Sequence, residues 1–230
     1  MATRKTAPPA PPAATAAAAS PRSLLFGELW PYEPAPESAA HIKLRPRYGH
    51  FIDGAYVESG TPFATINPAT EQPLAEVYAA DDATVDAAVR AARNAYDRVW
   101  SKLSPADRSK YLFRIARAIQ ERARELAIVE TMDGGKPIKE SRDVDVPLAA
   151  AHFFYYAGWA DKLGYAFPGA TPRPLGVVGQ VIPWNFPLLM AAWKIAPALA
   201  CGNTVVLKPA ETTPLTAMLL TEILQECELP

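Results

Sequence analysis

The chain has 230 residues, half of them hydrophobic, and its 23 Lys and Arg nearly balance 24 Asp and Glu, leaving a net charge of -1. This composition allows a sizeable core in one large or two modest domains and gives no signal for polyanion binding. The two cysteines lack regular spacing, and Lys194 and several prolines interrupt the longest apolar stretch. We therefore expect no disulfide framework, no metal site, no nucleic-acid partner and no membrane span.

Residues 1–40 differ from the rest of the chain. They contain the runs Pro8-Pro9-Ala10-Pro11-Pro12 and Ala16-Ala17-Ala18-Ala19 and few large apolar side chains. Basic residues without an acid before Glu28 faintly resemble a transit peptide, but the clustered prolines oppose the amphipathic helix that such a signal needs. We predict a disordered leader and extension over residues 1–40 of a cytoplasmic protein.

From His50 the sequence becomes typical of β-structure. Residues 50–57 are rich in β-forming side chains and contain a turn signal at Asp53-Gly54. A second turn signal, Asn67-Pro68-Ala69-Thr70, precedes the strand-like residues 73–79. The pattern predicts a β-hairpin region ahead of the helices.

Three helices are predicted next. The first carries apolar residues at helical spacing, namely Val85, Ala88, Val89, Ala92 and Tyr96. The second begins at the capping signal Ser104-Pro105-Ala106-Asp107 and continues through Val129. The third covers roughly residues 146–163 and is rich in aromatic side chains. His152 within it has no acid or second ligand at metal-ligand spacing, so we interpret it as a packing or surface histidine.

The remaining segment predicts the order β-α-β-α. Residues 176–182 form a β-branched run expected to be a strand buried on both faces, and Pro187–Ala200 form an apolar helix closed by Gly202. Residues 204–207 make a second strand, and Thr213-Pro214 opens another helix. The chain is therefore expected to be an α/β protein with parallel strands in a doubly wound arrangement.

Polar side chains follow each of these two strands, where open α/β sheets bind their ligands. Asn185 offers an amide that can donate to a developing oxyanion without titrating, and Lys208 and Glu211 offer a donor and an acceptor suited to sugar hydroxyls. Each also has an ordinary interpretation. An asparagine after a strand is commonly a turn residue, and a Lys/Glu pair commonly lies on a solvated face.

Two blocks together carry a resemblance to a known family. Pro183-Trp184-Asn185-Phe186-Pro187, followed by Gly-Asn-Thr-Val-Val-Leu-Lys-Pro-Ala-Glu at residues 202–211, closely resembles the NAD(P)-dependent aldehyde dehydrogenase superfamily. The resemblance extends from about His50 to Pro230, and Met132-Asp133-Gly134-Gly135-Lys136-Pro137 is a weaker echo of a turn between two early helices of that family. It implies that residues 41–230 are the N-terminal part of such an enzyme, with the first half of a Rossmann-like dinucleotide-binding domain.

The resemblance also implies roles for individual residues. Asn185 looks like the side-chain half of an oxyanion hole. The residues that resemble cofactor contacts are Ile182, Pro183, Trp184, Lys208 and Glu211. The residues that resemble the lining of the aldehyde tunnel are Phe186, Leu189, Met190 and Trp193, with plain core packing as the alternative. Glu211 near the adenosine ribose would favour NAD over NADP, because its carboxylate repels a 2′-phosphate.

The motifs that carry the family's nucleophilic cysteine and general-base glutamate do not occur in the sequence. Residues 179–182 imitate the first, but Ile182 stands in place of the cysteine, and Cys201 and Cys227 are interpreted as packing or surface residues. The leading hypothesis is therefore part of an oxidoreductase that converts an aldehyde to a carboxylic acid with NAD(P)+, inactive by itself. The alternative is a non-catalytic chain that assembles with a complete homologue or a separate back half; a homo-oligomer is also expected.

Overall fold

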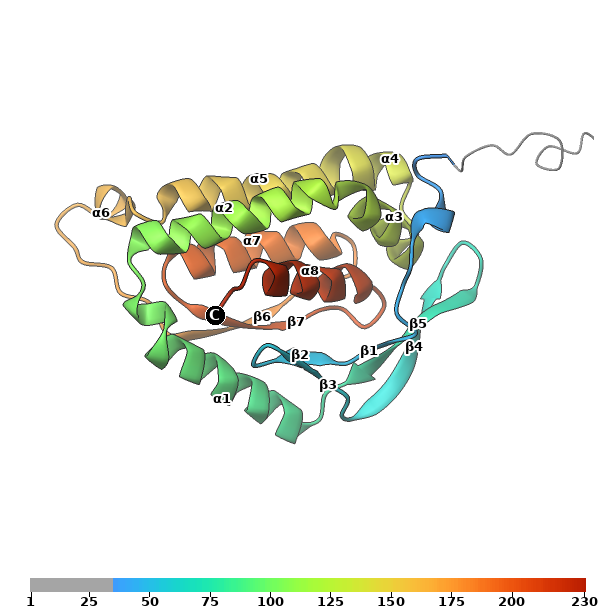
Figure 1. Ribbon diagram of the computed structural model, residues 1–230, viewed down its shortest axis with the longest axis horizontal. Coiled ribbons are helices and arrows are strands. Elements are labelled where there is room, and N and C mark those ends of the chain that lie inside the picture. Colours follow the sequence, from blue (N-terminus) through green and yellow to red (C-terminus); the bar gives the residue numbers. More distant parts are fainter. Residues whose placement is uncertain (1–34) are drawn as a thin grey trace, which may run out of the picture. The chain divides into compact units, whose positions relative to one another are not determined.

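Short strands precede most of the helices in the computed structural model, which describes residues 35–230 (Figure 1). Most of the predicted disordered leader lies outside these described residues. At its end, the Ser38 side chain accepts a hydrogen bond from the backbone of Ala40 and caps the 3-10 turn Ala39–His41. No helix within residues 35–230 is long and apolar enough to cross a membrane.

The predicted hairpin is confirmed. The strands of this region are β1 (Arg47–Tyr48), β2 (His50–Ile52), β3 (Ala55–Val57), β4 (Thr61–Asn67) and β5 (Gln72–Ala79). β2 and β3 pair antiparallel across Asp53 and Gly54, whose φ angles of 52° and 76° are those of a tight hairpin turn. Asn67 also forms its predicted turn, because its side chain accepts a hydrogen bond from the backbone of Ala69 at 2.9 Å.

Two strands were not predicted from the sequence. β4 pairs antiparallel with β5, and β1 pairs parallel with β5 on its other side. β4 contains Pro62 and has a register shift between Thr65 and Ile66, features that weaken the alternating pattern of a strand. β1 is too short to show a pattern.

The helices before the parallel strands are α1 (Asp82–Arg98), α2 (Pro105–Glu121), α3 (Ala123–Gly134), α4 (Ile138–Glu140), α5 (Val146–Trp159) and α6 (Leu163–Ala166). The predicted cap of α2 is confirmed, since the Ser104 hydroxyl accepts a hydrogen bond from the backbone of Asp107 at 3.1 Å. The third predicted helix is shorter than expected, ending at Trp159, and it is preceded by a π-helical turn over Ser141–Asp145.

The prediction of one continuous helix from residue 104 through Val129 was wrong. The chain leaves helical geometry at Arg122, where ψ is 14°, and so divides into α2 and α3. The Arg122 guanidinium lies 2.8 Å from Glu125 and 2.9 Å from Glu222 of a later helix. Glu125 is three residues away, but Glu222 is 100 residues away, so helical periodicity alone gave no sign of the contact that accompanies the break.

The β-α-β-α order is confirmed, with β6 (Val177–Val181), α7 (Pro187–Ala200), β7 (Thr204–Lys208) and α8 (Leu215–Glu226). β6 and β7 are parallel, pairing Val177 with Thr204. Gln180 of β6 donates to the backbone of Lys194 in α7, whereas Thr204 donates to the backbone of Ala92 in α1, so the two helices cover opposite faces. These elements establish the α/β class expected from the sequence.

One expectation about β6 was wrong. We expected burial on both faces, but Val181 is 67% exposed. α1 contacts β7 and β6 near the start of the strands, and Val181 stands at the opposite end of β6. Gly179 and Val181 on one face are exposed, whereas Gln180 and Ile182 on the other are buried, so only one face of β6 is uncovered toward its carboxyl end, where ligands of such sheets bind.

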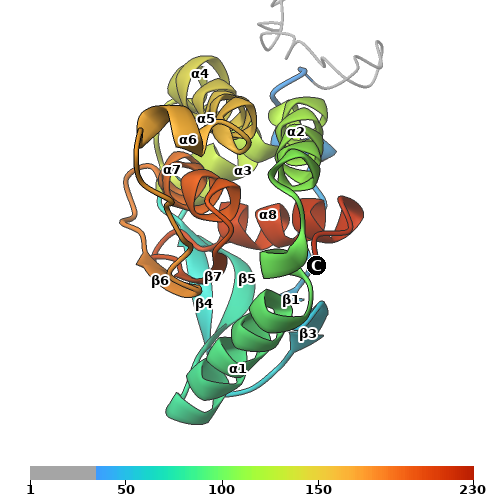
Figure 2. The same cartoon turned by 90° about the vertical axis from the view of Figure 1, so that its left-hand side faces the viewer.

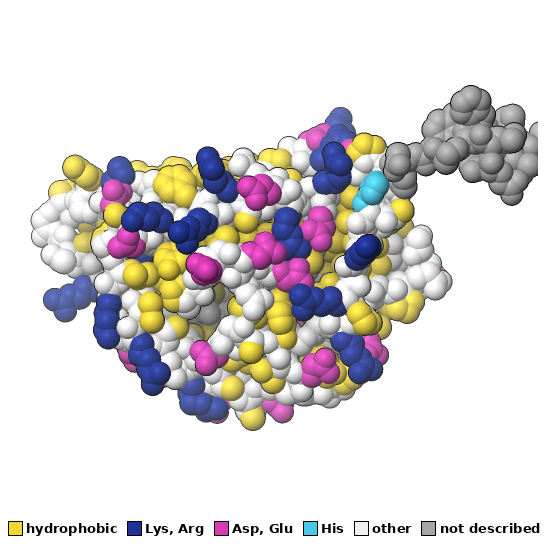
Figure 3. Space-filling view, in the orientation of Figure 1, with side chains coloured by type: hydrophobic (Ala, Val, Ile, Leu, Met, Phe, Trp, Pro, Cys, Tyr) yellow, Lys and Arg dark blue, Asp and Glu magenta, His cyan; other side chains and the backbone are white. Residues whose placement is uncertain are grey.

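Helical layers lie on one side of the β6–β7 pair (Figures 1 and 2). α2 packs against α5, and both contact α7, which lies over the two strands. The largest fully buried side chains of the core include Trp100, Phe153, Leu112, Ile115, Leu126 and Leu188. The face shown in Figure 3 carries acidic and basic side chains side by side, in keeping with the near-zero net charge.

Two acids of α3 hold the first turns of α7 and α8. Glu130 accepts a hydrogen bond from the backbone N–H of Leu188 at 3.4 Å, and Asp133 accepts one from the N–H of Leu215 at 2.8 Å. The first N–H groups of a helix have no partner within it, and its positive dipole end favours an anion. One turn of α3 therefore supplies acceptors to both crossover helices.

Burial of these acids changes their protonation. It raises the pKa of Glu130 to about 7 and that of Asp133 to about 6. Lys136 opposes the shift at Glu130, and the Thr65 hydroxyl, which donates to Asp133, opposes it there. Both carboxyls thus keep protons at a higher pH in the folded chain than in the unfolded chain.

We predict that Gly135→Ala destabilises the fold by about 1–3 kcal/mol, because Gly135 has a φ of 72° and an added Cβ would lie 2.6 Å from Pro68 Cγ. Gly134→Ala is the matched control, since its Cβ would make an ordinary 3.8 Å contact with Thr213. Thermal unfolding of the three proteins checks this, and equal losses in both variants would contradict it.

A second prediction concerns pH. Between pH 4.5 and 7 the Glu130 carboxyl ionises in the unfolded chain but stays protonated in the folded chain, so it lowers the free energy of unfolding as pH rises, by up to about 3 kcal/mol. Glu130→Gln should flatten this part of the stability profile, measured by urea unfolding at each pH. The exposed control Glu140→Gln should keep the wild-type slope. An unchanged slope in Glu130→Gln would refute the prediction.

Candidate functional site

The loop that follows β6 carries the predicted oxyanion donor. Ile182, at the end of the strand, is 2% exposed, and its N–H donates to the carbonyl of Lys208 at 3.2 Å. The next three residues, including Trp184 and Asn185, are exposed, and α7 begins at Pro187. The short turn between β6 and the buried first turn of α7 thus presents the Asn185 side chain at the carboxyl end of the sheet.

The loop that follows β7 carries the predicted ribose contacts. The Lys208 ammonium lies 2.5 Å from Glu211 Oε1, and both side chains are exposed. The hydrogen bond from Lys208 holds the pKa of Glu211 below the usual range, so the Glu211 carboxyl is an anion near neutral pH. An exposed donor and an exposed acceptor three residues apart can bind neighbouring hydroxyl groups.

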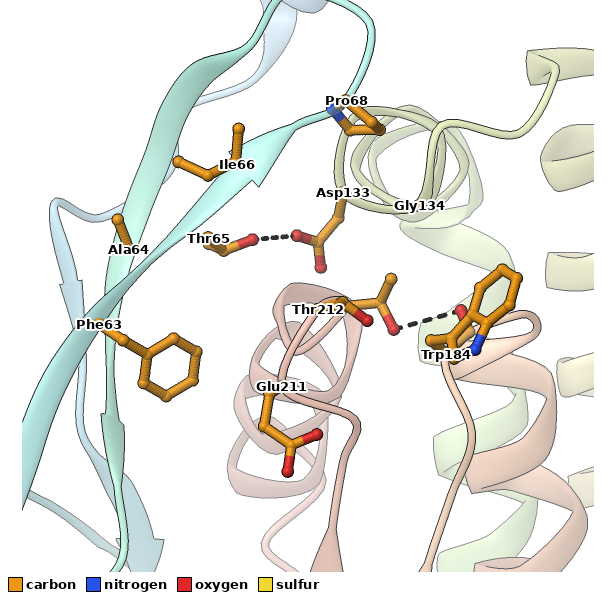
Figure 4. A pocket seen from close by; sticks show the side chains of 11 residues that line it. Phe63, Ala64, Thr65, Ile66, Pro68, Asp133, Gly134, Trp184, Glu211 and Thr212 are labelled. Atoms are coloured by element: carbon orange, nitrogen blue, oxygen red, sulfur yellow. Dashed lines mark hydrogen bonds between the residues drawn. The ribbon is translucent and has the colours of Figure 1, made fainter.

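The two loops contact each other. The Thr213 hydroxyl, just before α8, donates to the backbone carbonyl of Trp184 at 3.2 Å (Figure 4). Together with the bond from Ile182 to Lys208, this contact fixes one strand-end loop against the other. The structure therefore brings Asn185 and the Lys208–Glu211 pair to the carboxyl end of the two parallel strands, as predicted.

A pocket of about 460 Å³ opens beside these loops. Figure 4 shows Trp184 and Glu211 on one side and β4 on the other, with Asp133 pointing from α3 toward Thr65. Its lining residues are Phe63, Ala64, Thr65, Ile66, Pro68, Asp133, Gly134, Trp184, Glu211, Thr212 and Thr213. Two of the predicted cofactor residues therefore line a cavity, whereas Asn185 lies outside it.

The four predicted tunnel residues do not share one environment. Phe186 and Trp193 are 39% and 53% exposed, Met190 is half-buried, and Leu189 is 9% exposed and belongs to the core. Phe186 immediately precedes α7, and Met190 and Trp193 follow it after four and three residues, a spacing that is compatible with one side of the helix. A role of these residues in aldehyde binding stays a prediction.

The cysteines and histidine of this region have packing roles. Burial raises the pKa of both Cys201 and Cys227, which disfavours a thiolate at either position. His152 stacks on Trp193, with ring centroids 5.6 Å apart. Within residues 35–230, no three His, Cys, Asp or Glu side chains are grouped so that they could hold a metal ion.

Sequence reasoning missed the residues that support the two loops. Thr213 was assigned only to a helix start, and Glu130 was not singled out. Asp133 and Lys136 lie in the Gly-Gly turn that was recognised as a weak motif, but no role followed from it. Thr213 contacts Trp184, 29 residues away, and Glu130, Asp133 and Lys136 contact segments 50 or more residues away, which spacing along the chain does not reveal.

Comparisons with known proteins point in one direction. The model of the aldehyde dehydrogenase family matches residues 56–230. Aldehyde dehydrogenase family 2 member B4, mitochondrial, of Arabidopsis thaliana is 47% identical over 191 residues, which cover 79% of this chain and 35% of that protein. Retinal dehydrogenase 2 of Homo sapiens is 45% identical over 183 residues, 75% of this chain and 35% of its own length.

A solved structure agrees with these relatives. The NAD+ complex of an aldehyde dehydrogenase from Bacillus cereus matches with a TM-score of 0.76 and 40% identity, over 82% of this chain and 42% of that one. The chain thus spans about two fifths of the length of the proteins it matches. The solved structures it matches are aldehyde dehydrogenases, which contain the Rossmann-like NAD-binding domain expected from the sequence. On the match of the family model across most of its residues, the chain belongs to the aldehyde dehydrogenase family.

Proposed function

We propose that the chain supplies the oxyanion donor and the ribose-binding residues of an NAD+-dependent enzyme that oxidises an aldehyde to a carboxylic acid. The observation that carries the proposal is that the exposed Asn185 follows β6 and the exposed Lys208–Glu211 pair stands at the end of β7, two parallel strands whose carboxyl ends are paired. Hydrogen bonds between the two loops hold Asn185 and the Lys208–Glu211 pair at the carboxyl end of the strands. This end is the ligand-binding side of a doubly wound sheet.

The residues present fit a dinucleotide. The Glu211 carboxylate is exposed and charged, and its partner Lys208 is exposed as well, so both can bind ribose hydroxyls. Trp184, 62% exposed, offers a flat apolar surface beside them. NAD+, when bound, accepts the hydride that the aldehyde carbon gives up.

Asn185 acts on the substrate oxygen. Addition of a nucleophile to the aldehyde carbonyl places negative charge on that oxygen, and the Asn185 amide donates a hydrogen bond to it. The amide is neutral at all relevant pH values and makes no hydrogen bond with the rest of residues 35–230. Its donor is therefore free for the substrate.

The nucleophile and the general base come from outside this sequence in our proposal. The two cysteines have raised pKa values, and neither lies in the family's nucleophile motif. We propose that the chain acts with a further segment or subunit that supplies both groups, and that the active form is a homo-oligomer. The cytoplasmic location expected from the sequence stays a prediction.

The first test uses aldehyde-dependent NADH formation. The 230-residue chain alone should give none, whereas the chain joined at Pro230 to the downstream segment of the Bacillus cereus enzyme, called the complemented enzyme below, should be active. Asn185→Ala should lower its kcat by about 100-fold or more, while the exposed control Asn94→Ala on α1 should not. Activity of the chain alone, or full kcat in Asn185→Ala, would sink the proposal.

The second test concerns the cofactor. The complemented enzyme should prefer NAD+ to NADP+, because the Glu211 carboxylate repels a 2′-phosphate. Glu211→Ser should reduce the ratio of kcat/KM for NAD+ over NADP+ by about tenfold, an effect that salt weakens. The exposed control Glu140→Ser should leave the ratio unchanged. Equal use of both cofactors by the unmutated enzyme would show that Glu211 does not select between them.

A further inference from the structure

The turn Asp133-Gly134-Gly135-Lys136 has no place in the proposed chemistry, yet it contacts both loops of the site. Asp133 accepts the N–H of Leu215 at the start of α8. Lys136 lies against the other loop, with its ammonium 4.3 Å from the centre of the Phe186 ring. Gly135, with a φ of 72°, ends α3 and lets the chain turn between these two contacts.

Lys136 is held firmly where it meets Phe186. Its ammonium lies 2.5 Å from Asp145 Oδ2 and 3.6 Å from Glu130 Oε1, and the lysine side chain is 12% exposed. Asp145 and Glu130 are 1% and 0% exposed. The buried Lys136 ammonium lies between two buried acids and has little freedom to move, because a buried charge that loses its polar partners is costly.

The same cluster reaches the first turn of α7. The second oxygen of Glu130 accepts the N–H of Leu188, two residues beyond Phe186. An ammonium over an aromatic face is attracted to it, and here the lysine is 12% exposed while the Phe186 ring is 39% exposed. The cluster therefore contacts the chain at two points directly after Asn185.

The chain on the other side of Asn185 is held as well. The Trp184 carbonyl accepts the Thr213 hydroxyl at 3.2 Å. Asn185 itself is exposed, and its side-chain amide has no partner within residues 35–230. Its orientation therefore depends on the neighbours that flank it, Trp184 and Phe186.

We infer that Lys136 is a positioning residue, which fixes the Phe186 ring and thereby aims the Asn185 amide at the oxyanion. This inference rests on the proposed role of Asn185. Misplacement of a catalytic donor by about 1 Å can cost about 100-fold in rate. Lys136 does not touch the substrate and contributes only through the orientation of Asn185.

The first test needs no activity. In the 15N-labelled 230-residue chain, Lys136→Met should shift or broaden the side-chain amide signals of Asn185. The matched control is Lys139→Met, which removes an exposed lysine of the neighbouring helix α4 and should leave these signals unchanged. Unchanged Asn185 signals in Lys136→Met would overturn the inference, whatever the enzyme does.

The second test is a double-mutant cycle in the complemented enzyme. Lys136→Met should lower kcat by about 10- to 100-fold with KM for NAD+ unchanged, and Lys136→Arg, which keeps the charge, should restore part of the loss. In the Asn185→Ala background, Lys136→Met should change kcat by less than about twofold. Lys139→Met should have no effect in either background.

The outcomes separate the two ideas. If Asn185→Ala keeps full kcat, the proposed function fails. If Asn185→Ala loses activity but Lys136→Met does not, or if their losses simply multiply, the role of Lys136 fails while the proposed function stands. Should Lys136→Met not fold, Lys136→Met combined with Asp145→Asn removes the unpaired carboxylate too, and it must show the same loss of kcat for the inference to hold.

Discussion

The N–H groups at the starts of α7 and α8 both donate to side-chain carboxyl groups on a single turn of α3, those of Glu130 and Asp133. Each helix follows one parallel strand, so the position of its first turn decides where the loop between strand and helix lies. Because the two acids are three residues apart on a rigid helix, they set the distance between the two loops. The placement of Asn185 and Glu211 at the carboxyl end of the sheet depends on this arrangement.

Burying Glu130 and Asp133 against the helix starts costs free energy. Glu130 and Asp133 are almost completely buried, and burial raises the pKa of both. Helix N-termini, the Thr65 hydroxyl and the Lys136 ammonium offset part of that cost. Apolar residues at these positions would pack without the penalty but would leave the first N–H groups of α7 and α8 unpaired. The two acids therefore carry a burial penalty and pair the N–H groups at the starts of both helices.

The site combines rigid supports with exposed functional groups. Ile182 and the first turn of α7 are buried, whereas Asn185, Lys208 and Glu211 face outward. An amide and an ion pair that are not used by the protein itself are available to a ligand. The chain belongs to the aldehyde dehydrogenase family. The roles proposed for Asn185, Lys208 and Glu211 follow from their exposure beside a buried and rigid support.

Local sequence determined the elements whose signals are local: the Asp53-Gly54 hairpin, the Ser104 cap, the β-α-β-α order and the two motifs that place Asn185 and Glu211 at strand ends. Only the tertiary structure decided the break at Arg122, the pairing of β4 and the contacts of Glu130 and Lys136 with the loops. Those features depend on partners far along the chain, and hydrogen bonds and ion pairs between distant segments leave no periodic trace in the sequence. The short-range signals therefore gave the site residues, whereas long-range contacts decided how they are held.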